Sequence, residues 1–226
     1  MALRGSGAMV AMYDVEPGWE AGHDHWHAQE HMAERLGIPG FRRGRRAIAS
    51  DGRPRCFVMY EVDALSTQVS PAYLARLNDP TPWTRRVMPH MTGMTRTLAR
   101  VVASVGDAVG GWLATVRLNP PAAAKPGLVR WLAGGALAEA AGAEGLLGAH
   151  LLAGDAEASR TPTEEKTLRA APDEVADWIV MLEGYEGERV ALAVRRVAAL
   201  LAERGAGAGE LATYQLAQVL DAPRKK

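Results

Sequence analysis

The chain has one cysteine, two phenylalanines and no excess of either charge among its 226 residues. A single cysteine, Cys56, cannot close an internal disulfide, which fits a reducing compartment. Lys+Arg and Asp+Glu number 26 each, so no net field draws the chain to nucleic acid or to an anionic membrane surface. No apolar run approaches the roughly 20 residues of a membrane span, and the N-terminus lacks a signal-peptide core. We therefore expect a cytoplasmic protein that binds neither nucleic acid nor membrane.

Hydrophobic residues make up 48% of the chain, and they fall into alternating strand-like and helix-like stretches. In the first half the patterns predict strands at 8–15, 41–49, 56–62 and 94–104, and helices at 17–37 and 70–77. In the second half they predict strands at 111–118, 145–154, 177–185 and 210–220, and helices at 125–141 and 187–204. The order β-α-β-β-α-β, that of a ferredoxin-like unit, thus occurs twice.

A glycine-containing junction, VGDAVGG at 105–111, separates the two series of elements. We divide the chain there into a half at 1–106 and a second, degenerate half at 107–226. The predicted fold class is α+β, with tandem ferredoxin-like (βαββαβ) repeats that form one intrachain α/β barrel. The chain could be a monomer with such a pseudo-dimeric barrel, or a homodimer.

Two segments of the first half resemble a known superfamily. HWHAQEHMAERLGIPGFRRGRR (25–46) is similar to the helix-to-strand segment of dimeric α/β-barrel proteins, which often carry a tryptophan, a Glu-His pair and then Pro-Gly-Phe. SPAYLARLNDPTPWTRRVMPHM (70–91) resembles a bacterial branch related to EthD-like and antibiotic-monooxygenase-like proteins. The resemblance covers residues 8–103 and implies two sheets packed face to face with helices outside. The superfamily contains monooxygenases, isomerases and haem enzymes, so it implies a fold rather than a reaction.

The first predicted helix carries the candidate chemistry. At 100° per residue, Trp19 and Trp26 share an apolar stripe that should face the sheet, whereas Arg35 lies about 180° from Trp26 and should point to solvent. Imidazoles and carboxylates follow beside the stripe at spacings of three and four residues, and such groups can transfer protons near neutral pH. The candidate catalytic residues are His27, His31 and Glu30, and the candidate ligand-binding residues on this helix are His23 and Glu34.

Two quieter interpretations of these residues stay open. In the first, polar side chains beside an apolar stripe are simply the solvent-exposed margin of an ordinary surface helix. In the second, the same side chains hold a divalent metal. Residues 27–31 spell H-x-x-E-H, the inverted zinc-protease motif. That chemistry needs a larger protein with a further acidic ligand on another helix, which this sequence does not supply. We reject the peptidase and expect no metal and no cofactor.

Four further residues are candidates for ligand binding. Tyr13 and Tyr60 fall on adjacent central strands, where core packing is the alternative role. Trp83 lies in a loop that could anchor over the core, and His90 precedes the fourth strand and could approach the first helix.

Arginines crowd the second predicted strand, which lies at the edge of a ferredoxin-like sheet. Charges there normally protect an edge against aggregation, and the alternative is that one arginine meets an anionic ligand. The arginines are Arg42, Arg43, Arg45 and Arg46.

The two halves differ in chemistry. The second-half helix at 125–141 has no histidine, so we expect the site in the first half, with the second half as scaffold. Two functions of different classes remain open. The chain is either a cofactor-independent enzyme or small-molecule-binding protein, with acid/base or monooxygenase-like chemistry on an aromatic or polyketide-like compound, or a non-catalytic structural or assembly protein. A haem- or metal-binding role is a weaker third alternative, and the sequence names no substrate.

Overall fold

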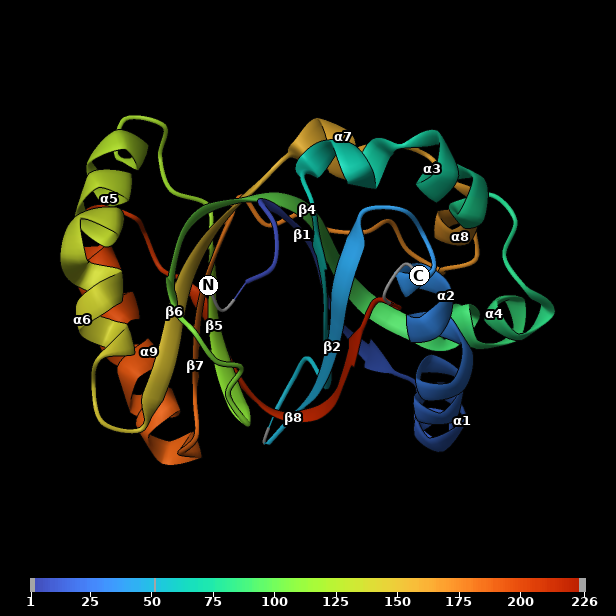
Figure 1. Cartoon of the computed structure of the whole chain (residues 1–226), viewed down its shortest axis with the longest axis horizontal. Coiled ribbons are helices and arrows are strands. Elements are labelled where there is room, and N and C mark those ends of the chain that lie inside the picture. Colours follow the sequence, from blue (N-terminus) through green and yellow to red (C-terminus); the bar gives the residue numbers. More distant parts are fainter. Residues whose placement is uncertain (1–2, 51, 224–226) are drawn as a thin grey trace.

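A closed barrel of antiparallel strands forms the centre of the computed structural model, which describes residues 3–50 and 52–223 (Figure 1). Within these residues the strands are β1 (Gly7–Val15), β2 (Phe41–Ala49), β3 (Cys56–Val62), β4 (Met91–Gly106), β5 (Trp112–Leu118), β6 (Leu146–Gly154), β7 (Trp178–Gly184) and β8 (Glu210–Asp221). Around the barrel they follow the order β1-β3-β2-β8-β5-β7-β6-β4.

The barrel consists of two sheets with the same internal order. The first sheet runs β4-β1-β3-β2 and the second β8-β5-β7-β6, and they join where β2 pairs with β8 and β4 with β6. This arrangement confirms the predicted fold class. Whether 1–106 and 107–226 are separate domains is not tested by the strand order and stays a prediction.

Helices cover the outside of both sheets. Those of the first half are α1 (Glu20–Trp26), a π-helical turn η1 (His27–His31), α2 (Met32–Leu36), η2 (Leu65–Val69), α3 (Pro71–Leu77), α4 (Pro82–Val87) and η3 (Met88–His90). Those of the second half are α5 (Lys125–Trp131), a π-helical turn η4 (Leu132–Ala136), α6 (Leu137–Ala141), α7 (Ala156–Arg160), α8 (Glu164–Thr167) and α9 (Gly187–Glu203). In Figure 1, α5, α6 and α9 flank one side of the barrel and α1 to α4 the other. In the described part of the chain no helix is long and apolar enough to cross a membrane.

The near-continuous apolar sequence of β1 is explained by burial on both faces. Met9 and Ala11 pack toward Trp26 and the other helical residues of the first half, whereas Val10 and Met12 pack inside the barrel. Successive side chains of a strand point to opposite faces, so a strand between helices and a barrel interior must be apolar at nearly every position.

The arginines of β2 are not edge charges, because β2 lies between β3 and β8. Arg45 is fully buried in the barrel, where Nε donates to Glu61 Oε1 at 2.7 Å and Nη1 donates to Glu183 Oε2 at 2.8 Å. Arg43 Nη2 donates to Glu61 Oε2 at 2.8 Å. Our prediction of edge protection is therefore wrong. Closure of the barrel removes the edge and turns two of its charges into buried ion pairs.

The first helix contains a π-helical turn that the 100° rule does not anticipate. Trp26 is fully buried, as predicted, and Trp19 is half-buried. Arg35 was expected in solvent but is 1% exposed. A π-turn inserts one extra residue into the helix, so every later residue lags by about 100°. Arg35 then falls about 80° from Trp26 instead of 180°, on the inner side of the helix.

The connection between β6 and β7, residues 155–177, crosses to the first half; we call it the covering segment. It carries α7 and α8 and lies along the part of β4 that β6 leaves free. Glu174 N donates to Met94 O at 2.8 Å, Arg96 N donates to Glu174 O at 2.8 Å, and Leu98 N donates to Ser159 Oγ at 2.9 Å. The covering segment thus closes over the outer face of the first sheet.

Candidate functional site

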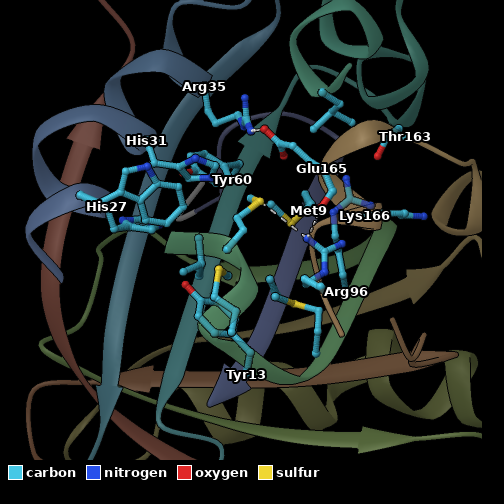
Figure 2. A pocket seen from close by; sticks show the side chains of 18 of the residues that line it. Met9, Tyr13, His27, His31, Arg35, Tyr60, Arg96, Thr163, Glu165 and Lys166 are labelled. Carbon is cyan, nitrogen blue, oxygen red and sulfur yellow. Dashed lines mark hydrogen bonds and ion pairs between the residues drawn. The ribbon is translucent and has the colours of Figure 1, made fainter. Parts of the chain in front are cut away.

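A cavity lies on the outer face of the first sheet, beneath the first helix and the covering segment (Figure 2). Its floor comes from β1, β3 and β4, and its walls from η1, α2, α3 and α8. Four of the chain's nine methionines line it, namely Met9, Met88, Met91 and Met94. The free space inside it is about 40 Å³, room for a few water molecules. A larger ligand therefore requires the walls to shift, which unbranched, flexible methionine side chains allow.

The π-turn directs His27 and His31 to this cavity. They are 1% and 7% exposed, and their ring centroids lie 5.4 Å apart. Within the described residues, both ring nitrogens of His27 and Nδ1 of His31 are buried without a hydrogen-bond partner. Burial lowers the pKa of both imidazoles well below the ordinary value. Two neutral imidazoles therefore border the cavity near neutral pH with unused hydrogen-bonding capacity.

Two tyrosines from the sheet complete this end of the cavity. The hydroxyl of Tyr60 is buried and has no hydrogen-bond partner among the described residues, and burial raises the pKa of Tyr60. The ring of Tyr60 lies 6.5 Å from that of His31, centroid to centroid. Tyr13 also lines the cavity, but its hydroxyl lies 2.9 Å from His23 Nε2. Tyr60 is thus the tyrosine with a free hydroxyl.

His23 orients Tyr13 instead of facing the cavity. His23 Nδ1 lies 3.0 Å from Asp24 Oδ1. Burial alone would raise the pKa of Asp24, but hydrogen bonds from His23 and Arg55 hold it well below its usual range. An ionised Asp24 accepts a hydrogen bond from Nδ1–H, so Nε2 accepts one from the Tyr13 hydroxyl. Asp24, His23 and Tyr13 thus form a chain of hydrogen bonds behind the cavity wall.

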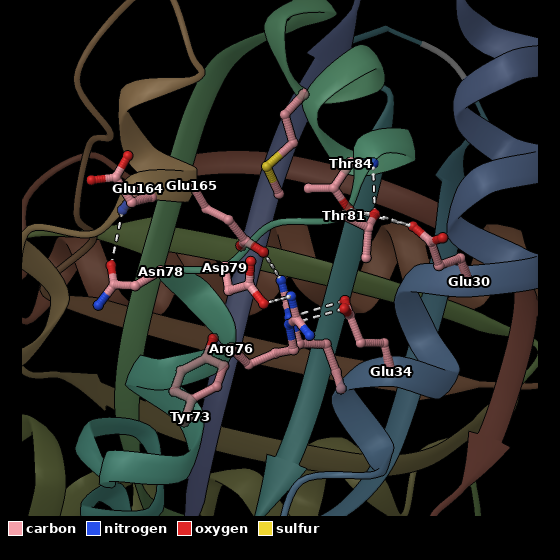
Figure 3. Close-up of polar contacts among 12 residues, drawn as sticks. Glu30, Glu34, Tyr73, Arg76, Asn78, Asp79, Thr81, Thr84, Glu164 and Glu165 are labelled. Atoms are coloured by element: carbon pink, nitrogen blue, oxygen red, sulfur yellow. Dashed lines mark hydrogen bonds and ion pairs between the residues drawn. The ribbon is translucent and has the colours of Figure 1, made fainter.

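Glu30 and Glu34 do not line the cavity; they tie the first helix to its neighbours (Figure 3). Glu30 Oε1 accepts a hydrogen bond of 2.6 Å from Thr81 Oγ1, which also caps α4. Glu34 Oε1 pairs with Arg76 of α3 at 3.0 Å, and Glu34 Oε2 with Arg35 at 3.2 Å. Both carboxylates therefore have structural partners.

Trp83 and His90 also lie outside the cavity lining. The Trp83 ring packs near His25, with centroids 5.4 Å apart. His90 stacks on Trp19 at 3.5 Å between centroids, and its Nδ1 lies 2.7 Å from Glu16 Oε2. Of the nine sequence-predicted site residues, four line the cavity, namely His27, His31, Tyr13 and Tyr60.

The far wall of the cavity is charged, and the sequence reasoning missed it. Arg35 forms a buried ion pair with Glu165, and Arg169 Nη2 pairs with Asp173 Oδ2 at 2.7 Å. Glu165 and Arg169 belong to the covering segment, so the second half contributes to the lining of the cavity. One signal was available: 155–176 separates two strands that are neighbours in a ferredoxin-like sheet, and loops of that length are usually functional.

Neither a metal nor a haem fits these residues. In residues 3–50 and 52–223 there is no group of three or more His, Cys, Asp or Glu side chains that could hold a metal ion. A porphyrin is rigid and many times larger than this cavity, so repacking of methionine side chains, which would admit one small aromatic molecule, would not admit it. Trp26 also packs against one side of His31, with centroids 4.3 Å apart.

Comparison with solved structures shows that the fold of this chain is similar to that of monooxygenase-like proteins. It matches an anthrone oxidase-like protein with a TM-score of 0.64 at 12% identity, over 99% of this chain and 96% of that one. It matches a presumed monooxygenase from Fusobacterium nucleatum subsp. nucleatum with a TM-score of 0.60 at 9% identity, over 99% and 100%. A mutant chlorite dismutase from Candidatus Nitrospira defluvii gives 0.53 at 11%, over 94% and 93%.

No family model matches the sequence, and no curated protein matches it. At identities of 9 to 12%, the structural matches show the fold alone. They confirm the resemblance to dimeric α/β-barrel proteins, whereas the relation to EthD-like proteins stays a prediction.

Proposed function

We propose that the cavity binds a small aromatic or polyketide-like molecule and that His27 accepts a proton from it. The observation that carries this proposal is a buried imidazole on the cavity wall, with no hydrogen-bond partner for either nitrogen among the described residues. Such a group loses its hydrogen bonds to water on folding and regains none. A ligand with an acidic O–H or C–H would restore one of them.

Proton transfer in this cavity would create an ion pair, whose attraction offsets part of the cost of charging His27 where burial disfavours its protonated form. Burial keeps His27 neutral in the free protein, so it can act as a base. After transfer, an imidazolium lies beside an enolate or phenolate, and opposite charges in a low-dielectric site stabilise each other. The free hydroxyl of Tyr60 could donate a hydrogen bond to the developing oxyanion. His31 would serve as a second acceptor.

The walls fit an apolar ring. Methionine thioethers make favourable contacts with aromatic faces and adapt to different shapes, and Trp26 adds an aromatic surface. The same first step serves two reactions. Return of the proton to another carbon gives an isomerisation. Reaction of the carbanion with dioxygen as co-substrate would convert a CH₂ group to C=O with release of one water.

Anthrone tests the proposal, because its CH₂ group is acidic and its ring is apolar. We expect the protein to accelerate hydrogen–deuterium exchange at that carbon in D₂O under argon, followed by NMR. His27→Ala should lower the rate by about 10²-fold, the lower bound for a positioned general base. His25→Ala, at an exposed position of the same helix, is the matched control and should leave the rate unchanged.

Two results would contradict the proposal: exchange no faster than in buffer, or equal rates for the wild-type protein and a folded His27→Ala variant. Admission of air then separates the reactions, since oxygenation converts anthrone and O₂ to anthraquinone and water.

A further inference from the structure

The cavity wall opposite His27 carries more positive than negative charge. Four cationic side chains line it, namely Arg35, Arg96, Lys166 and Arg169, against one carboxylate, Glu165. The pairs Arg35–Glu165 and Arg169–Asp173 account for two of the cations. Arg96 and Lys166 remain, and Figure 2 shows them together at the side of the cavity away from the histidines.

Arg96 is a buried cation with a neutral partner. It lies on β4, is 9% exposed, and donates from Nη2 to the Tyr73 hydroxyl at 3.0 Å. The described residues give it no carboxylate within ion-pair distance. A buried guanidinium without a counter-charge is costly, and its planar fork of donors suits a carboxylate.

Lys166 of α8, which lies near Arg96 in Figure 2, also has neutral hydrogen-bond partners. Its ammonium donates to the carbonyl oxygens of Ser159 and Thr161, the latter at 2.9 Å, and both are neutral acceptors. Burial and the nearby positive charge of Arg96 lower the pKa of Lys166 to about 8. An ammonium has three donors, so one stays available. Two cations from opposite halves of the chain thus face one cavity. Among the described residues no carboxylate lies within ion-pair distance of either, although the charge of Asp173, which pairs with Arg169, also acts on Lys166.

We infer that the ligand is an aromatic carboxylate whose anionic group lies between Arg96 and Lys166, with its proton-donating end at His27. This inference rests on the proposed function and defines its substrate class. Met9 lies between the two ends of the cavity in Figure 2, where an apolar ring would fit. The covering segment, through Lys166, would then determine specificity for a substrate whose chemistry occurs on the first half.

Two probes of nearly equal size, one with a carboxylate and one with a neutral carboxamide, test whether the cavity prefers a negative charge. 4-Hydroxybenzoate carries one negative charge at neutral pH, 4-hydroxybenzamide carries none, and both have a phenol at the far end. A hydrogen bond to a charged group contributes about 1.5–3 kcal/mol, so we expect 4-hydroxybenzoate to bind at least about tenfold more tightly. Chemical-shift titration by NMR gives both dissociation constants.

Variants then test whether Arg96 and Lys166 cause the preference for 4-hydroxybenzoate. Arg96→Met and Lys166→Met should each bring the two dissociation constants to within about threefold, whereas Lys166→Arg should retain most of the preference. Arg100→Met is the matched control on β4, since Arg100 pairs with Asp155 at the surface, and it should leave the preference intact.

Equal affinities of the wild-type protein for the two probes, a preference unchanged in both methionine variants, or no binding of either probe at millimolar concentration would overturn the inference. Its failure is separable from that of the proposed function. His27→Ala should lower the exchange rate on anthrone, a neutral compound, by about 10²-fold while leaving the carboxylate preference in place.

Discussion

His27 and His31 oppose folding, because their buried nitrogens lose hydrogen bonds to water. Helical periodicity predicts that both residues lie beside the apolar stripe of Trp19 and Trp26, and the structure has them there. Periodicity could not distinguish them from Glu30, which has the same local spacing. The carboxylate of Glu30 turns to Thr81 of the segment before α4, and the position of that segment follows from the tertiary fold. Helical periodicity finds a face, but not the partner of each side chain on it.

The two buried imidazoles should make stability fall at mildly acidic pH. Their pKa is lowered in the folded protein, so between the folded value and the unfolded value of about 6.5 the unfolded chain binds more protons. The free energy of unfolding then decreases as pH falls below about 6.5, by up to about 1.4 kcal/mol per pH unit for each histidine. Urea titrations between pH 7.5 and 5.5 measure the slope. His27→Gln should reduce it and His25→Gln should not; an unchanged slope in His27→Gln would refute this linkage.

Trp26→Ala should destabilise the protein by about 3–5 kcal/mol, the usual cost of truncating a buried aromatic residue. The side chain is fully buried, and its Nε1 donates to Thr84 Oγ1 at 3.2 Å. Equilibrium unfolding in urea provides the measurement. The control is Trp83→Ala, at a partly exposed position in the first turn of α4 and not in the loop that the sequence predicts, and its loss should be smaller. A loss below about 1 kcal/mol for Trp26→Ala would mean that this face of the helix does not support the core.

At the scale of elements, both halves contain a π-helical turn in the helix after the first strand. In the first half it spans His27–His31. In the second it spans Leu132–Ala136, where Gly135 has non-helical dihedrals and the helix is kinked. In the second half Leu132 and Leu137 fill the space above the sheet. The helix after the first strand is therefore irregular at the same place in both halves, and the residues there decide whether a cavity or a core results. The helix was predictable from its flanking Pro17 and Gly37. The extra residue was not, since a π-turn has no distinct apolar period.

The inward rotation of Arg35 makes the Arg35–Glu165 pair an anchor for the covering segment. Arg35 and Glu165 are 1% and 4% exposed, and removing one partner of a buried pair leaves the other charge uncompensated. Arg35→Met and Glu165→Met should each cost about 3–5 kcal/mol. The double variant should lose much less than the sum of the two single losses.

Urea unfolding of the wild-type protein, the two single variants and the double variant measures the coupling free energy between Arg35 and Glu165. The exposed pair Arg100–Asp155 is the control, and Arg100→Met should cost less than about 1 kcal/mol. Additive losses for Arg35 and Glu165 would show that the pair does not hold the segment.

At the scale of the whole molecule, charges inside the barrel link the two halves. Arg45 of β2 contacts Glu61 of β3 and Glu183 of β7, and His150 Nε2 of β6 lies 2.8 Å from Glu183 Oε1. The hydrogen bonds of His150 and the charge of Arg45 outweigh burial and lower the pKa of Glu183 to about 2. The repeated order of elements was enough to predict a barrel. The contact between Arg45 and Glu183 was not predictable, because it joins residues 138 positions apart.

The first half expressed alone, residues 1–106, should therefore precipitate or associate with itself. It would expose the edges of β2 and β4 that pair with β8 and β6, and open edges template association. It would also remove Glu183, one of the two carboxylates that pair with Arg45. Size-exclusion chromatography with light scattering measures the mass, and co-expression with residues 107–226 should restore a soluble complex of one copy of each half. A soluble, folded monomer of residues 1–106 would contradict this prediction, since it would show that the first sheet needs no second sheet to cover its inner face.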